Sequence, residues 1–195
     1  SRRLGRGGGQ QDEAERKHAA HHITCMPEGR RGMLRAMRQL VLASASRYRR
    51  ELLERLGIPF EICAADVDER AVDLPPQPLA AHLAELKAEA VAERFPEAVI
   101  IGSDQVPAVT IDGREEILVK PGTVDRAVAQ LQRLGGRTHR LITAVTVLDA
   151  ATGESETHVD VHRLRIRQLP EDALRRYVEA DQPLDCAGAY KIESL

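Results

Sequence analysis

The chain has 195 residues, enough for one domain with a substantial core and short for two. Its 43% apolar and 30% charged residues are typical of a globular protein, and no apolar run approaches the length of a membrane span. A net charge of −2 with only 3% aromatic residues argues against nucleic-acid binding through a basic surface or base stacking.

The three cysteines, Cys25, Cys63 and Cys186, lie far apart and form no CxxC pair. Such a sparse, odd-numbered set favours a reducing compartment over a disulfide framework or a zinc site. The N-terminus also lacks the apolar core of a secretory signal. We therefore expect a cytoplasmic protein.

Residues 1–36 are rich in Gly and Arg and show no regular apolar period, which predicts a disordered leader or a cloning remnant. Met33 and Met37 are alternative translation starts just before the first apolar run. An Arg-rich RNA-binding or mitochondrial targeting leader is an alternative interpretation. The folded domain is expected to span residues 37–195.

Strands and helices are expected in turn along this domain. The apolar patterns predict strands at 39–43, 58–63, 99–102, 106–111, 116–119, 139–149 and 156–168, and helices at 47–57, 79–95, 124–134 and 171–179. Three prolines between residues 75 and 78 predict a loop, and Asp112-Gly113 predicts a hairpin turn. This order predicts an α/β domain with a mixed central sheet and flanking helices.

The segment 40–57 predicts an anion site. An apolar strand leads into a turn with Ser44 and Ser46, followed by Arg49 and Arg50 at the beginning of a helix. Free backbone N–H groups and the helix dipole favour an anion there, and phosphate is the obvious one.

Carboxylates suited to catalysis occur at two places. Asp104 is expected just after a buried strand, where α/β sheets bind ligands, so it could hold a metal or activate water. A turn or helix-cap role for Asp104 is equally open. Asp66, Asp68 and Glu69 offer hard oxygen ligands for Mg²⁺ or Mn²⁺, with a solvated loop as the alternative.

Other polar residues are weaker candidates one by one. Lys87 and Lys120 could neutralise phosphate or simply lie on the surface, and His139 and Cys186 are expected to be structural. Taken together, phosphate donors, hard carboxylates and lysines favour metal-assisted hydrolysis of a nucleotide phosphoanhydride.

Seven ordered motifs between residues 39 and 195 resemble the Maf family of nucleotide pyrophosphatases. They are LVLASASRYRRELLERLG, VDER, LAELKAEA, IIGSDQV, LVKPG, LGGRTHRLITAV and DCAGAYKIES. The resemblance implies a fold like that of the inosine-triphosphate pyrophosphatases, and hydrolysis of a nucleoside triphosphate to the monophosphate and pyrophosphate. It implies a divalent cation (Mg²⁺, Mn²⁺ or Co²⁺) and makes a homodimer reasonable. The family continues past KIES, so we expect the C-terminal part of the domain to be missing.

The resemblance also implies roles for single residues. Asp104 matches the proposed proton acceptor and a metal ligand, and Glu69 matches an acidic metal ligand. Lys87 and Lys120 match two cleft lysines. The serine-rich turn matches a triphosphate-binding segment, with Ser44, Ser46, Arg49 and Arg50 as contacts.

Three positions point to a subfamily. Tyr48, Gln105 and Glu193 stand where relatives acting on dTTP and UTP have Arg, Thr and Gln, which resembles the 7-methyl-GTP subfamily. A carboxylate such as Glu193 can accept from the guanine edge, and an aromatic face such as Tyr48 suits a cationic base. The alternatives are a dTTP/UTP or broader nucleotide pyrophosphatase, and a non-catalytic regulator of cell division.

Overall fold

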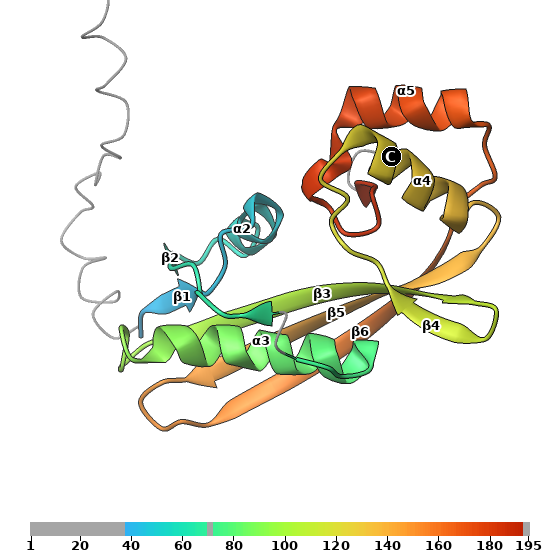
Figure 1. The fold of residues 1–195 in the computed structure, drawn as a ribbon. Coiled ribbons are helices and arrows are strands. Elements are labelled where there is room, and N and C mark those ends of the chain that lie inside the picture. The colour runs from blue at the N-terminus through green and yellow to red at the C-terminus, as the bar shows by residue number, and fades with distance from the viewer. Residues whose placement is uncertain (1–37, 70–71, 193–195) are drawn as a thin grey trace, which may run out of the picture. The chain divides into compact units, whose positions relative to one another are not determined.

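The computed structural model describes residues 38–69 and 72–192, so the expected leader and Glu193 lie outside the described residues. In the described region a six-stranded mixed sheet has the order β2-β1-β3-β5-β6, with β4 paired to β3 (Figure 1). The strands are β1 (Leu40–Leu42), β2 (Glu61–Ile62), β3 (Val99–Ile111), β4 (Arg114–Ile117), β5 (Thr138–Asp149) and β6 (Ser155–Arg165). The helices are α2 (Arg47–Glu54), α3 (Pro76–Ala92), α4 (Val124–Leu134) and α5 (Glu171–Asp181), with a 3₁₀ turn η2 (Pro183–Asp185).

Both strand directions occur in this sheet. β1 is parallel to β2 and β3, whereas β3, β5 and β6 are antiparallel neighbours. The expected α/β domain with a mixed sheet is confirmed. Asp112 (φ 50°) and Gly113 (φ 76°) form the expected hairpin turn between β3 and β4.

Two expectations from the sequence are wrong. Residues 99–111 form one continuous strand, because Val99 to Val109 pair without a break with β5. Asp104 therefore lies within a strand and does not follow one. Pro76 and Pro78, expected in a loop, belong to the first turn of α3, where a missing N–H costs no helical hydrogen bond, and Pro75 directly precedes the helix.

The main core lies between α3 and one face of the sheet. Leu83 and Ala84 of α3 pack with Val106 and Ile142, and Ala88 and Val91 pack with Ile100 nearer the helix C-terminus. Figure 1 shows α3 along this face, with α2, α4 and α5 on the other side. Even-numbered residues of β3 therefore face α3, because side chains alternate along a strand.

The opposite face is covered at one end by α4 and α5. Val109 and Leu134 are buried there together with Leu118. His139 of β5 is 1% exposed, and its Nε2 lies 2.8 Å from the hydroxyl of Tyr190. Val145 and Val147 lie further along this face and remain exposed. Within the described residues no helix is long and apolar enough to cross a membrane.

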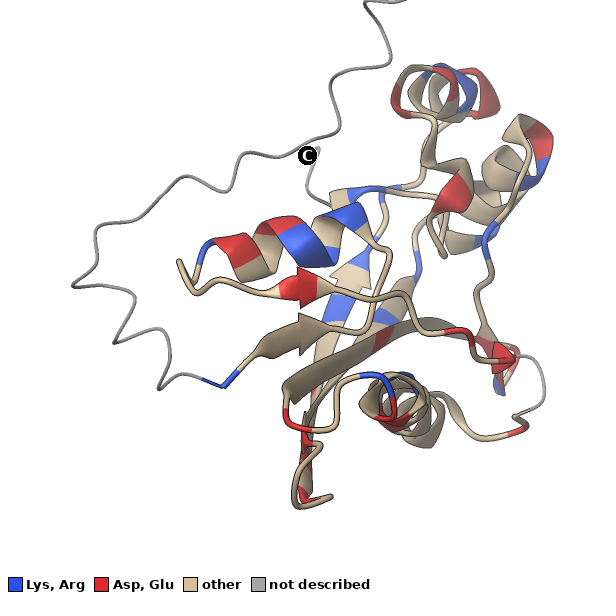
Figure 2. Cartoon of the chain, turned by 90° about the vertical axis from the view of Figure 1, so that its left-hand side faces the viewer, with Lys and Arg blue, Asp and Glu red and all other residues tan. Residues whose placement is uncertain are grey.

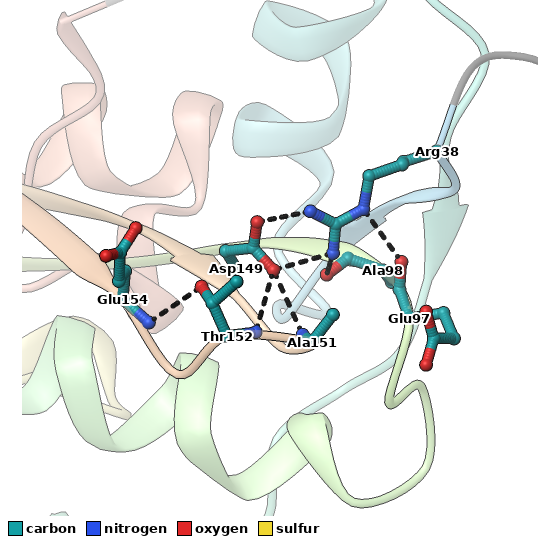
Figure 3. A network of polar contacts seen from close by, with 7 residues as sticks. All are labelled: Arg38, Glu97, Ala98, Asp149, Ala151, Thr152 and Glu154. Carbon is teal, nitrogen blue, oxygen red and sulfur yellow. Dashed lines mark hydrogen bonds and ion pairs between the residues drawn. The ribbon is translucent and has the colours of Figure 1, made fainter.

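Arg38 ties the beginning of the sheet to the β5–β6 turn (Figure 3). Its guanidinium forms a two-point ion pair with Asp149, with Nη2 2.7 Å from Oδ1, and its Nε donates to the carbonyl oxygen of Glu97 at 3.1 Å. The hydrogen bonding of the Arg38 guanidinium to the Asp149 carboxylate lowers the pKa of Asp149 to about 2. Asp149 also accepts from the backbone of Ala151 and Thr152, so one carboxylate organises the turn.

Candidate active site

A buried ion pair lies between α3 and β3. Lys87 on α3 places its Nζ 2.6 Å from Asp104 Oδ1 and 2.7 Å from Glu69 Oε1. Lys87 and Asp104 are each 7% exposed, whereas 53% of the Glu69 side chain is exposed. Burial of a charged pair is tolerated when the partners contact each other directly. One ammonium therefore joins a buried and an exposed carboxylate.

Arg49 approaches the same carboxylate from α2. Its Nη2 lies 3.9 Å from Asp104 Oδ1, and its Nη1 donates to Ser44 Oγ at 3.1 Å. Burial lowers the pKa of Arg49 from its ordinary value, while the charges of Asp104 and Glu69 act in the opposite direction. Arginine remains a cation under these conditions because its ordinary pKa is so high.

The serine-rich turn shapes the beginning of α2. Ser44 Oγ accepts from the backbone N–H of Ser46 at 3.1 Å, and Ser46 caps the helix by accepting from Arg49 N at 3.5 Å. Serine is a preferred residue at this capping position. The turn therefore directs Arg49 back toward the strand ends and Asp104.

The structure does not bring every expected phosphate contact, nor the expected specificity residue Tyr48, to this place. Arg50 points along α2, where its Nε lies 3.8 Å from Glu54, and Tyr48 lies under the guanidinium of Arg47 at 5.2 Å. Figure 2 shows acidic and basic residues interspersed along α2. Lys120 is exposed and forms no hydrogen bond or ion pair with another described residue.

The side chain of Gln105 projects from the other face of the sheet. Its Nε2 donates to Thr143 Oγ1 at 2.9 Å, on the side opposite α3 and Lys87. Glu193, the third expected specificity residue, lies outside the described residues.

The sequence reasoning missed Gly102. A Cβ at this position would lie 2.1 Å from the carbonyl oxygen of Ala84 and 2.8 Å from the nitrogen of Ala88. Only glycine lets α3 approach β3 this closely, and Lys87 reaches Asp104 across that contact. A glycine inside an apolar strand is a known signal of close backbone approach, so the position could have been found.

Two carboxylates are the metal donors that this site offers. Among the described residues no group of three or more His, Cys, Asp or Glu is arranged to hold a metal ion. Glu69 and Asp104 supply hard oxygens, which fit Mg²⁺ or a similar ion whose remaining ligands are substrate phosphates and water. They do not fit a structural zinc site.

Comparison with known proteins decides the family. The Maf-like protein family model matches residues 39–195. This chain belongs to the Maf-like family. A 7-methyl-GTP pyrophosphatase of Aromatoleum aromaticum is 48% identical over 80% of this chain and 79% of its own length. One from Nitrosococcus oceani is 43% identical over 80% of this chain and 77% of its own length.

Likeness to solved structures is weaker. The Ham1 protein of Staphylococcus aureus has a TM-score of 0.48 and 15% sequence identity, covering 65% of this chain and 70% of that one. A likeness at this level bears on neither fold nor function. The fold is therefore described from the strand pairing of the Maf-like chain itself, and its function is inferred from its site and its relatives.

Proposed function

We propose that this Maf-like chain hydrolyses a nucleoside triphosphate, preferably 7-methyl-GTP, to the monophosphate and pyrophosphate. The observation that carries the proposal is the buried Lys87–Asp104 pair with Arg49 beside it. It combines one carboxylate that can accept a proton from water with two cations that can bind phosphate oxygens. The choice of 7-methyl-GTP as substrate is based on relatives of 43–48% identity that are named 7-methyl-GTP pyrophosphatase.

Asp104 is the base in this proposal. Lys87 and Arg49 both contact its Oδ1, so Oδ2 is the oxygen that takes the proton of the attacking water. Water adds to phosphorus, the anhydride bond between the α- and β-phosphates breaks, and pyrophosphate leaves. Lys87 and Arg49 stabilise the negative charge that grows on the phosphate oxygens.

Glu69 and Asp104 would hold a divalent cation, which neutralises phosphate charge when bound. The Glu69 side chain can adjust to the arriving metal–nucleotide complex because about half of it is exposed to solvent. Mg²⁺, Mn²⁺ and Co²⁺ are the candidate ions, since all accept carboxylate and phosphate oxygens.

Tyr48, Gln105 and Glu193 are the proposed base-recognition residues. The amide of Gln105 already donates to Thr143, so its Oε1 can accept from the N–H groups of a guanine edge. Tyr48, which carries the Arg47 guanidinium over its ring, offers a face that suits the cationic 7-methylguanine base.

Pyrophosphate release from a nucleotide panel tests the function. The full-length protein is incubated with 7-methyl-GTP, GTP, dTTP and UTP and each metal ion, beside Asp104→Asn. We expect 7-methyl-GTP to be the best substrate, and kcat of Asp104→Asn to fall by about 100-fold or more, as for loss of a general base. Asp112→Asn is the matched control, because Asp112 is exposed in the hairpin turn.

Each other outcome selects an alternative. Faster hydrolysis of dTTP or UTP would mean that the base-recognition residues are wrongly assigned. No hydrolysis of any nucleotide by the folded protein would leave the non-catalytic regulator.

The proposal includes a homodimer in the cytosol. The outer edge of β6 pairs with no strand of the described region, and long unpaired edges are sites of strand pairing between chains. Cys63 is a buried free thiol, which is compatible with a reducing compartment. Light scattering after size-exclusion chromatography measures the mass of the assembly, and a monomer would contradict the proposed homodimer.

A further inference from the structure

We propose that Lys87 is an internal cation, meaning an ammonium that holds the two metal-binding carboxylates in the metal-free protein and competes with the metal for them. The inference rests on the proposed function, since it takes Glu69 and Asp104 as the metal ligands. It adds that metal alone binds poorly, and that the nucleotide's phosphates release Lys87 from this position.

The geometry places one cation between two carboxylates. Glu69 belongs to the loop before α3 and Asp104 to β3, yet both contact the same Nζ, at 2.7 and 2.6 Å. A metal ion that uses these two oxygens therefore has to displace the ammonium. Lysine is suited to such exchange, because its charge sits at the end of a flexible four-carbon chain.

The charge balance favours exchange only when phosphate is present. Lys87 is buried, so its ammonium needs an anionic partner wherever it goes. Without nucleotide, Glu69 and Asp104 are its partners, and Arg49 adds a second positive charge 3.9 Å from Asp104. A triphosphate brings several negative oxygens, which can receive the ammonium and supply ligands to the metal. Metal and nucleotide should therefore bind with positive coupling.

A simple structural salt bridge makes the opposite prediction. If Lys87 only kept the two carboxylates in place, its removal would loosen them and weaken metal binding. If Lys87 competes with the metal, its removal strengthens metal binding even though nucleotide binding suffers. The sign of the change therefore separates the two roles.

The test is Mn²⁺ binding without nucleotide, measured by electron paramagnetic resonance on the full-length protein and on Lys87→Met. Methionine keeps the length of the side chain and removes its charge.

We expect Lys87→Met to bind Mn²⁺ at least about 10-fold more tightly than the wild type, which corresponds to about 1.4 kcal/mol. Arg94→Met is the control for charge, since Arg94 is exposed just after the same helix, and should match the wild type within about 2-fold. Equal or weaker binding to Lys87→Met overturns the inference.

Thermal unfolding gives a second readout if Lys87→Met is unstable. Mn²⁺ should raise its unfolding temperature more than that of the wild type, because the metal replaces the lost ammonium. An equal or smaller rise counts against competition. Tighter Mn²⁺ binding to Lys87→Met, with no nucleotide hydrolysis by the wild type, would refute the proposed function alone. Hydrolysis by the wild type, without tighter Mn²⁺ binding to Lys87→Met, would refute the internal cation alone.

Discussion

Asp104 and Gln105 are neighbours on β3, so their side chains leave opposite faces of the sheet. Asp104 meets Lys87 of α3, and Gln105 meets Thr143 of β5. One strand thus carries a group proposed for the phosphates next to a group proposed for the base. β1 ends at Leu42, which pairs with Ile101 of β3. A nucleotide that contacts both Asp104 and Gln105 would therefore have to cross the edge of β3 beyond this last pair.

A change at Gln105 tests the assignment of the base-recognition residues. In Gln105→Thr the shorter side chain can no longer present an acceptor while bonding to Thr143. We expect the ratio of kcat/KM for 7-methyl-GTP to that for dTTP to fall by about 3- to 10-fold, which is the worth of one hydrogen bond. Steady-state kinetics with both nucleotides measures the ratio.

The control is Thr110→Ser, at an exposed position of the same strand, which should leave the ratio unchanged. A Gln105→Thr enzyme with the wild-type ratio would show that Gln105 does not contact the base.

Residue roles were predictable from the sequence to different degrees. Asp104, Lys87, Glu69 and Arg49 were all named from motifs, and the structure brings them together. Their contacts could not be derived from spacing, because Lys87 and Asp104 are 17 residues apart and meet only through the packing of α3 on β3. Periodicity alone could not separate them from surface residues.

At the scale of elements, α4 was predicted with its correct ends and β3 was not. Thr123 and Gly135 are strong local signals at the two ends of α4. In β3 the residues Gly102 to Gln105 resemble a turn by composition, but their pairing with residues 143–146 of β5 keeps them extended. Such non-local pairing overrides local preference and is invisible in a single sequence.

Gly102→Ala tests the contact between α3 and β3. The added Cβ would lie 2.1 Å from a backbone oxygen, so the helix must shift away and carry Lys87 with it. We expect a loss of about 2 kcal/mol or more in the free energy of unfolding, measured by urea titration, and a fall in kcat/KM.

Thr110→Ala is the control for the strand, because Thr110 is exposed and should change the free energy of unfolding by less than about 0.5 kcal/mol. A Gly102→Ala protein of wild-type stability would mean that α3 need not pack so closely.

At the scale of the whole folded region, the α4–α5 layer joins the sheet through His139 and Tyr190. Tyr190 packs with the cluster that Ala127, Leu131 and Leu174 form between the two helices. Its ring also meets His139 edge-on, with centroids 5.4 Å apart. The Nδ1 of His139 is buried and forms no hydrogen bond with a described residue. A proton there would have no acceptor, so the imidazole is stable only when neutral.

This arrangement predicts a loss of stability in mild acid. Burial lowers the pKa of His139 below its ordinary value, so between that value, about 6.5, and the lower folded value the unfolded chain binds more protons. Stability is therefore full above about pH 6.5 and falls as the pH drops toward the pKa of the folded state. Asp149 does not contribute in this range, because its pKa of about 2 means that the stability it provides is lost only at much lower pH.

We expect the unfolding temperature of the wild type to fall between pH 6.5 and 5, and the fall to flatten in His139→Gln, which stays neutral. His158→Gln, exposed on β6, should keep the wild-type slope, and an equal slope in His139→Gln would assign the acid sensitivity to other groups.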